Sequence, residues 1–300
     1  MSALRVDPNL STELLAGINN NQQEISVDLQ ELSTGKAVNS LGQGPAAAAS
    51  LVVNDAQTAQ VDQYQSDISG LQALLQVGDS TMSSVVNLMN QAISLGVEGA
   101  NGTLSSSDRQ ALASQLSGIL QQMVGLANTT YQGNYIFSGT NDQTAPFTID
   151  ASAPDGVTYN GNTDVNSVQI SNGQTLPVNV PGSQIFQNSS GDVFGALSQM
   201  ITALQSNSGI AAANASLENA FNTVNAQRVF YGNGGAELNT ATTFLNQEQV
   251  DLSSQQNSLV GADLGAVASD YSQAEVQQQA LLTASGKILS EPTLFDYLPA

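Results

Sequence analysis

The sequence predicts a mainly α-helical protein, in which a long coiled-coil-like bundle is built from both chain halves and a small antiparallel β insertion lies in the middle. Two observations carry this prediction. In both halves, apolar residues recur at alternating spacings of three and four, which is typical of helices packed along their length. Between residues 146 and 187 this spacing disappears, and six of the eight prolines lie at or after Pro146.

The first helix is expected near the N-terminus, before the Gly35-Lys36 pair. Its apolar residues follow helical spacing, although a polar run, Asn19–Gln23, interrupts them. The apolar positions are Leu10, Leu14, Ile18, Ile25, Leu29 and Leu32.

The most regular pattern begins at Val61 and predicts one long helix. Gly78 lies inside this pattern and is expected to weaken the helix by about 1 kcal/mol relative to alanine. The other positions of the pattern are Tyr64, Ile68, Leu71, Leu75, Met82, Val85, Met89 and Ala92.

A third helix is expected to start at Ser105. The Ser105 hydroxyl can accept a hydrogen bond from a free backbone N–H, and Asp108 suits the positive end of the helix. Apolar residues then follow at Leu112, Leu116, Ile119, Met123 and Leu126.

The middle of the chain carries short runs of β-favouring residues separated by Asp-Gly, Asn-Gly and Pro-Gly pairs. Such pairs are typical of turns between antiparallel strands. The runs contain Val157 and Tyr159, then Val165, Val168 and Ile170, then Leu176, Val178 and Val180.

Helical spacing returns after the insertion, with four leucines seven residues apart at Leu238, Leu245, Leu252 and Leu259. The segment Gly232–Ala236 lacks the Gly-Lys-Ser/Thr ending of a phosphate-binding loop. We therefore interpret it as a kink or break between helices. A final helix is predicted from Leu264, Val267, Tyr271, Ala274, Gln278, Leu281 and Ile288.

These elements divide the chain into five segments. Residues 1–45 form an N-terminal assembly helix and residues 46–140 the first half of the helical core. Residues 141–191 form the β-rich insertion. Residues 192–262 complete the core, and residues 263–300 form a C-terminal assembly helix.

The terminal helices are expected to serve assembly. Ordering about 30 residues costs roughly 1–2 kcal/mol each in backbone entropy, and one narrow apolar stripe cannot recover this cost alone. Each terminal helix must therefore pack against the opposite terminus or against neighbouring copies. The expected assembly residues are Leu10, Leu14, Ile18, Ile25, Leu29, Leu32, Leu281, Ile288, Leu294, Phe295, Tyr297 and Leu298.

The charge balance argues against several kinds of partner. The net charge is −20, from 25 acidic and 5 scattered basic residues, so neither nucleic acid nor an anionic membrane surface is expected to bind. No apolar run of about 18 residues exists to span a membrane. The N-terminus lacks a basic segment followed by an apolar stretch, so a cleaved signal peptide is not expected.

The composition also argues against an enzyme. The chain has no His and no Cys, which removes Ser–His and Cys–His nucleophiles and thiolate metal sites. A pair of carboxylates could still support glycoside hydrolysis, but nothing distinguishes two of the 25 acids. We expect no catalytic residue, cofactor or metal ion.

Several segments resemble the flagellin superfamily, and within it the family of hook–filament junction proteins. The resemblance covers both helical halves, with the motifs in the family's order, whereas the β insertion matches by position only. Two departures are Gly42-Gln-Gly44 before Pro45, where the family has acidic residues, and Asn134 in place of a base. The matching segments are Leu29–Ser40, Pro45–Ser50, Asn101–Arg109, Leu126–Thr129, Gly133–Thr140, Ala145–Phe147, Ala262–Leu264, Gln279–Ser285 and Leu294–Leu298.

The resemblance implies that the terminal helices pair as a coiled coil lining a tube and that the β insertion projects outward. It implies partners: the first hook-associated protein on the hook side, flagellin on the filament side, and copies of the chain itself in a ring. It also implies type III export to the outside of the cell without a cleaved signal, with a chaperone on the C-terminal helix.

Three alternatives remain open. A flagellin-type filament subunit would have similar termini but would grow long filaments by itself. A carboxylate-dependent hydrolase at the cell surface would turn over a glycan. A coiled-coil adhesin would bind surfaces through its terminal helices.

Overall fold

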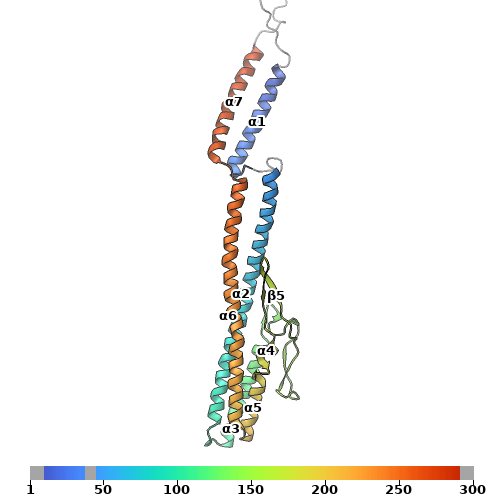
Figure 1. The fold of residues 1–300 in the computed structure, drawn as a ribbon, viewed down its shortest axis with the longest axis vertical. Helices are drawn as coiled ribbons and strands as arrows, with labels where there is room; N and C mark the ends of the chain where they lie inside the picture. The colour runs from blue at the N-terminus through green and yellow to red at the C-terminus, as the bar shows by residue number, and fades with distance from the viewer. Residues whose placement is uncertain (1–9, 38–44, 291–300) are drawn as a thin grey trace, which may run out of the picture. The chain divides into compact units, whose positions relative to one another are not determined.

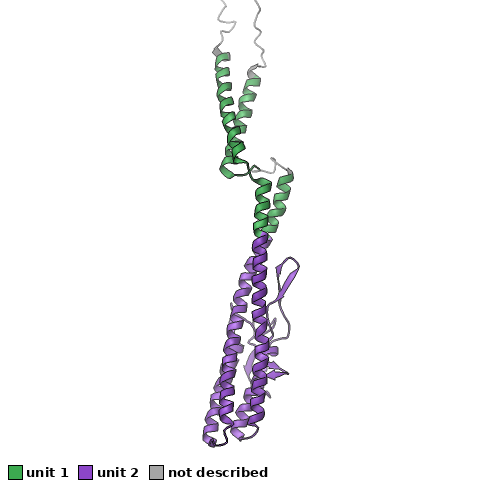
Figure 2. Ribbon diagram, turned by 60° about the vertical axis from the view of Figure 1, so that its left-hand side comes forward, with its two compact units in different colours: residues 1–59, 249–300 green, residues 60–248 purple. Residues whose placement is uncertain are grey.

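The structure, a computed structural model, describes residues 10–37 and 45–290 and confirms the mainly α-helical fold. The chain forms two compact units, one from residues 1–59 with 249–300 and one from residues 60–248 (Figure 2). The helices are α1 (Leu10–Thr34), α2 (Pro45–Gly99), α3 (Ser106–Ala127), α4 (Gly182–Phe186), α5 (Val193–Ser206), α6 (Ile210–Val260) and α7 (Leu264–Ser290). The predicted division into five segments remains a prediction.

In the unit of residues 60–248, α2 and α6 run antiparallel and side by side (Figure 1). Their pairing is visible in cross-helix hydrogen bonds, from Gln65 to Asn246 at 3.1 Å and from Gln72 to Asn239 at 3.3 Å. These bonds confirm that segments far apart in the sequence lie together. The buried side chains along this pair include Ile68, Leu75, Met82, Val85, Met89, Leu217, Val224, Leu238 and Leu245.

Two glycines let α6 approach α2 closely, and one expectation is corrected. A Cβ at Gly78 would collide with the buried ring of Tyr231, so this glycine makes room for a tyrosine and does not merely weaken the helix. The predicted break at Gly232–Ala236 is wrong, because α6 is continuous there. Gly234 lies directly against Leu75, and buried Tyr231 and Leu238 flank the segment, so packing outweighs the poor helix propensity of glycine.

The third helix begins as predicted. The Ser105 hydroxyl accepts a hydrogen bond from the Asp108 N–H at 3.1 Å, and the Asp108 carboxylate accepts one from the Ser105 N–H at 3.1 Å. These two bonds form a complete capping box. The Ser105 hydroxyl also donates to the Asp108 carboxylate at 2.7 Å, and this bond, with a smaller contribution from the Ser105 N–H, lowers the pKa of Asp108. The helix α3 then packs against α5. Leu116 of α3 and Leu197 of α5 are both fully buried.

The β insertion consists of antiparallel two-stranded pairs, as predicted, and the described strands do not join into one larger sheet. The longest pair is β5–β6, which turns at Asn172-Gly173, with Gly173 at a positive φ of 78°. The strands are β1 (Thr130–Tyr131), β2 (Asn134–Tyr135), β3 (Phe147–Ile149), β4 (Val157–Tyr159), β5 (Ser167–Ser171), β6 (Gln174–Pro177), β7 (Gln187–Asn188) and β8 (Gly191–Asp192).

An aromatic cluster anchors these short strands to the helices. Phe137, Phe147, Phe186 and Phe194 are fully buried, and neighbouring rings in the cluster lie 5.2–5.7 Å apart. Such spacing is favourable for edge-on and tilted aromatic contacts. Isolated hairpins are marginal in water, so this cluster provides the core that the hairpins lack.

Candidate assembly surface

The helices α1 and α7 form an antiparallel pair drawn from the two ends of the chain (Figure 1). At one end of the pair, Lys36 and Gly261 form an isolated β-bridge. Farther along, the Asn21 side chain bonds to the main chain at Ala274, and Gly17 lies 3.8 Å from Leu281 as measured from an added Cβ. The C-terminal end of α1 therefore lies opposite the N-terminal end of α7, so the two helices run antiparallel.

Local turn chemistry sets where each helix of the pair ends or begins. Gly35 has a φ of +68°, which favours glycine, and its N–H donates to the Glu31 carbonyl at 2.7 Å to close α1. The Asp263 carboxylate accepts hydrogen bonds from the N–H groups of Gly265 and Ala266 and so caps the start of α7. The end of the first helix that was expected before the Gly35-Lys36 pair is therefore confirmed.

An inner seam of residues at alternating spacings of four and three joins the two helices. Its members are less exposed than most of their neighbours, as expected for a two-helix coiled coil. In this unit α1 has no buried apolar side chain from Thr12 to Thr34. The inner seam consists of Leu14, Ile18, Asn21, Ile25, Asp28 and Leu32 of α1, and of Val267, Tyr271, Ala274, Gln278, Leu281 and Ser285 of α7.

The most buried described side chain of α1 is polar. Asn21 is 3% exposed, and its Nδ2 donates to the Ala274 carbonyl at 3.0 Å, while its Oδ1 has no partner. A buried amide with one unsatisfied atom costs free energy, yet it favours the one alignment in which its bond forms. We therefore expect Asn21 to help set the register of the α1–α7 pair at the expense of its stability.

A second group of apolar side chains faces away from this seam and stays exposed. Leu15 is 61% exposed and Val276 is 69% exposed. We call the exposed apolar side chains Leu15, Leu29, Val276 and Leu282 the outer flank. Beside it, small residues hollow the surface of α7 at Ala280, Thr283 and Ala284, where another helix can approach closely.

The expected assembly residues fall into three groups. Five lie half-buried in the inner seam: Leu14, Ile18, Ile25, Leu32 and Leu281. Leu29 belongs to the exposed outer flank. Leu10 and Ile288 belong to helices whose side chains are not described at these positions, and Leu294, Phe295, Tyr297 and Leu298 lie outside the described residues.

Sequence reasoning missed the polar members of the seam and most of the outer flank. Asn21 and Asp28 complete the spacing between Leu14 and Leu32, so extending the pattern through polar positions would have found them. Leu15 and Leu29 lie fourteen residues apart, two full heptads, on a second face of the same helix.

The described surface offers little chemistry of other kinds. Within residues 10–37 and 45–290, no three acidic side chains are placed to hold a metal ion together. Over the same ranges, no helix combines the length and apolar character needed to cross a bilayer. On α7, a hydrogen bond from the Tyr271 hydroxyl to the Glu275 carboxylate raises the pKa of Tyr271.

The family model for the bacterial flagellin N-terminal helical region matches residues 8–142. With its paired terminal helices, long helical bundle and small β-hairpins, the chain is a structural subunit of the flagellin class. Flagellar hook-associated protein 3 of Salmonella typhimurium is 30% identical over 92% of this chain and 93% of its own length. The chain belongs to the family of flagellar hook-associated protein 3.

Two further relatives agree. Flagellar hook-associated protein 3 of Escherichia coli is 28% identical, again over 92% of this chain and 93% of its own length. The crystal structure of the flagellar junction protein FlgL from Legionella pneumophila shares the fold, with a TM-score of 0.61 at 14% identity, over 71% of this chain and all of that one. The chain is thus a flagellar component, and the flagellum is an extracellular appendage built from such proteins.

Proposed function

We propose that this chain is the subunit that joins the hook to the filament of a bacterial flagellum. In this proposal copies of the chain form a ring, with the first hook-associated protein on one side and flagellin on the other. The α1–α7 pair makes these contacts through its outer flank, together with the expected residues Leu10, Ile288, Leu294, Phe295, Tyr297 and Leu298.

The single observation that carries the proposal is the group of apolar side chains left exposed on the α1–α7 pair. Leu15, Leu29, Val276 and Leu282 are all about half exposed or more. Burying a fully exposed side chain of this kind contributes about 1.5–3 kcal/mol, and roughly half of that remains to be gained from one that is half exposed. Several of them on one short helix pair therefore supply a strong drive for association.

The alternative is a flagellin-type filament subunit. Identities of 28–30% over 92% of the chain to proteins named hook-associated protein 3 favour the junction role. A filament subunit would polymerise without limit when purified, whereas a junction subunit stops after a limited assembly. Sedimentation of the purified chain with and without filament seeds separates the two.

The remaining parts of the proposal follow from the family resemblance and the composition. The chain is structural and not an enzyme, which agrees with the absence of His and Cys from the sequence. Export through the flagellar type III apparatus needs no cleaved signal. A chaperone covers the C-terminal helix before export, when the outer flank of α7 would otherwise be exposed in the cytoplasm.

The decisive experiment deletes the gene in its host and restores it with variants. The deletion strain is expected to keep its hooks, lose its filaments and release flagellin into the medium. Wild type and Ser272→Asp, which places the same charge on an exposed polar position of α7, should restore filaments. Leu15→Asp and Leu282→Asp should not, because a charge in the buried interface is costly.

The four seam and flank variants also test the geometry. Leu14→Asp and Leu281→Asp are expected to abolish assembly and to leave the thermal melting of the residue 60–248 unit nearly unchanged. Normal filaments from a strain carrying Leu15→Asp would contradict the assigned surface. Filaments in the deletion strain itself would contradict the junction role.

A further inference from the structure

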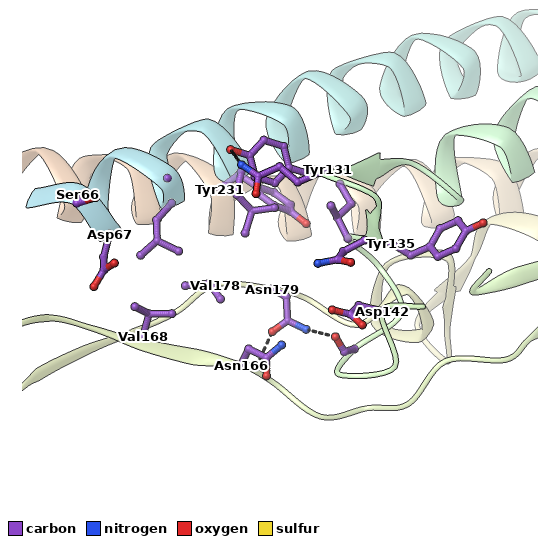
Figure 3. A pocket seen from close by; sticks show the side chains of 17 residues that line it. Ser66, Asp67, Tyr131, Tyr135, Asp142, Asn166, Val168, Val178, Asn179 and Tyr231 are labelled. Carbon is purple, nitrogen blue, oxygen red and sulfur yellow. Dashed lines mark hydrogen bonds between the residues drawn. The ribbon is translucent and has the colours of Figure 1, made fainter. Parts of the chain in front are cut away.

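A solvent-open cavity of about 510 Å³ lies in the unit of residues 60–248 and takes no part in the proposed assembly surface (Figure 3). It is bounded by α2 and α6 on one side and by the β1–β2 and β5–β6 hairpins on the other. Its size falls within the range of about 300–1,000 Å³ that small-molecule sites occupy. The apolar side chains that line it are Leu71, Leu74, Ile136, Val168 and Val178.

One nearly buried side chain of this cavity carries a hydroxyl group that has no hydrogen-bond partner among the described residues. This side chain is Tyr231, which reaches the cavity from α6 and is only 5% exposed. Burial raises the pKa of this hydroxyl, so it stays protonated and able to donate. The Tyr231 hydroxyl is therefore available to donate a hydrogen bond to a molecule in the cavity.

The surrounding chain holds Tyr231 and the opposite wall in place. Gly78 leaves the room that the Tyr231 ring occupies. Across the cavity, the Asn179 side chain donates to the carbonyls of Gly139 and Asp164 and accepts from the Asn166 N–H at 2.7 Å (Figure 3). The cavity is therefore braced in the free chain, which lowers the entropic cost of binding.

The charges of the lining exclude anionic ligands. Asp67 and Asp142 lie among the lining residues, which include no Lys or Arg, and the whole chain carries a net charge of −20. Repulsion would oppose phosphate, sulfate or carboxylate groups. The carboxylates instead suit ligands that donate hydrogen bonds.

The uncharged side chains of the lining limit the class of ligand further. Apolar side chains and the rings of Tyr131 and Tyr231 offer surface to C–H groups, while Asp67, Asp142 and Asn166 offer hydrogen bonds. A sugar presents this combination, with an apolar ring face and hydroxyl groups around its rim. Neutral sugars also avoid the repulsion described above.

We propose that this cavity binds a neutral carbohydrate and that the Tyr231 hydroxyl forms a direct hydrogen bond to it. The site goes beyond the junction role and does not depend on it, because none of its residues belongs to the α1–α7 pair. It gives an extracellular structural subunit a second capacity, which is recognition of uncharged glycans.

The test uses the full purified chain and ligand-observed NMR with neutral tetrasaccharides of glucose, mannose and N-acetylglucosamine at millimolar concentration. Tyr231→Phe removes only the hydroxyl and is expected to weaken binding roughly tenfold, the equivalent of one hydrogen bond. Tyr271→Phe on α7 is the matched control and should bind as the wild type does.

A second variant fills the cavity without disturbing the fold. Gly70 lies on α2 at the cavity, and a Cβ added there meets no atom within 4 Å, so Gly70→Leu should fold normally and abolish binding. Gly125→Leu is its control, because Gly125 is an exposed glycine of α3 with the same free space and lies outside the lining. Both variants should still restore filaments in the deletion strain, so failure of this proposal is distinguishable from failure of the junction role.

Three results would overturn the proposal. The first is no binding of any neutral tetrasaccharide by the wild type. The second is binding that survives both Tyr231→Phe and Gly70→Leu, or that is equally strong for a hyaluronan tetrasaccharide, which is anionic. The third is loss of ring assembly in Gly70→Leu, which would show that a segment of a neighbouring subunit fills the cavity.

Discussion

The α1–α7 pair and the helical body of residues 60–248 share the same heptad pattern but differ in how deeply their side chains are buried. In the body, large side chains such as Met82, Leu116 and Leu197 are fully excluded from solvent. In the described part of the α1–α7 pair, the buried side chains are Val267, Ala274 and the polar Asn21. Periodicity therefore predicts that a helix forms. The depth of burial indicates whether its apolar face is covered within the chain or is left for a partner to cover.

The largest expected effect is a loss of folding stability in the body of residues 60–248, with little change in the α1–α7 pair. Leu116→Ala should lower the free energy of unfolding by about 3–5 kcal/mol, because it leaves a cavity in a closely packed core. The matched change Leu282→Ala on the outer flank should alter it by less than about 0.5 kcal/mol in the free chain. Urea denaturation followed by circular dichroism measures both.

These two values test whether the contrast between the regions is real. Similar losses from Leu116→Ala and Leu282→Ala would mean that the outer flank is already covered within the free chain. The exposed surface would then give no support to assembly.

A smaller effect of opposite sign is expected in the α1–α7 pair. Asn21→Leu removes a buried amide whose Oδ1 is unsatisfied, and should stabilise the pair by about 1–2 kcal/mol. Amide hydrogen exchange in α1 measures this gain. The same change should relax the register, because the bond to the Ala274 carbonyl is lost.

Cysteine cross-linking measures that register, since the natural chain has no Cys. Gly17→Cys paired with Leu281→Cys should cross-link in the wild-type background, whereas Gly17→Cys paired with Gln278→Cys should not. With Asn21→Leu both pairs should react. Unchanged selectivity would mean that other residues set the alignment.

The last expected effect, on the pH dependence of stability, concerns an exception within the well-packed body. Asp192 caps α5 by accepting a hydrogen bond from the Gly195 N–H at 2.9 Å. Burial, with a smaller contribution from the charge of Asp155, raises the pKa of Asp192 from its usual 3.8 to about 6. The folded state therefore holds a proton that the unfolded state has already lost between these two values.

Stability should accordingly fall as the pH rises from 3.8 to about 6. The expected loss is about 1–2 kcal/mol, a figure reduced for the partial solvent exposure of the carboxyl group. Asp192→Asn keeps the cap and removes the charge, so its melting temperature should vary less over this range. A variant with the same pH profile as wild type would show that another group titrates there.

Most helices and their order were predictable because helical periodicity and capping are local properties. The pattern from Tyr64 to Ala92 gave the middle of α2, and Ser105 with Asp108 gave the start of α3. Gly232–Ala236 was misjudged, because the contacts that keep α6 continuous come from α2, which lies far away in the sequence.

The candidate site was predictable only in part, for the same reason. Apolar positions such as Leu14 and Ile18 follow from spacing, and the structure brings them to one seam with Leu281. The role of Asn21 does not follow from spacing, because its partner Ala274 is 253 residues away. The Tyr231 cavity likewise depends on α2, α6 and two hairpins meeting at one place.

The helical fold class, the position of the β insertion and the family could all be predicted from the sequence. The reason is that residue spacing, turn residues and motifs are local features of the chain. Only the tertiary structure decided which apolar side chains are covered and which remain free. Coverage depends on distances between segments that the order of residues does not specify, so Leu14 and Leu15 are adjacent in the chain yet face a partner helix and solvent respectively.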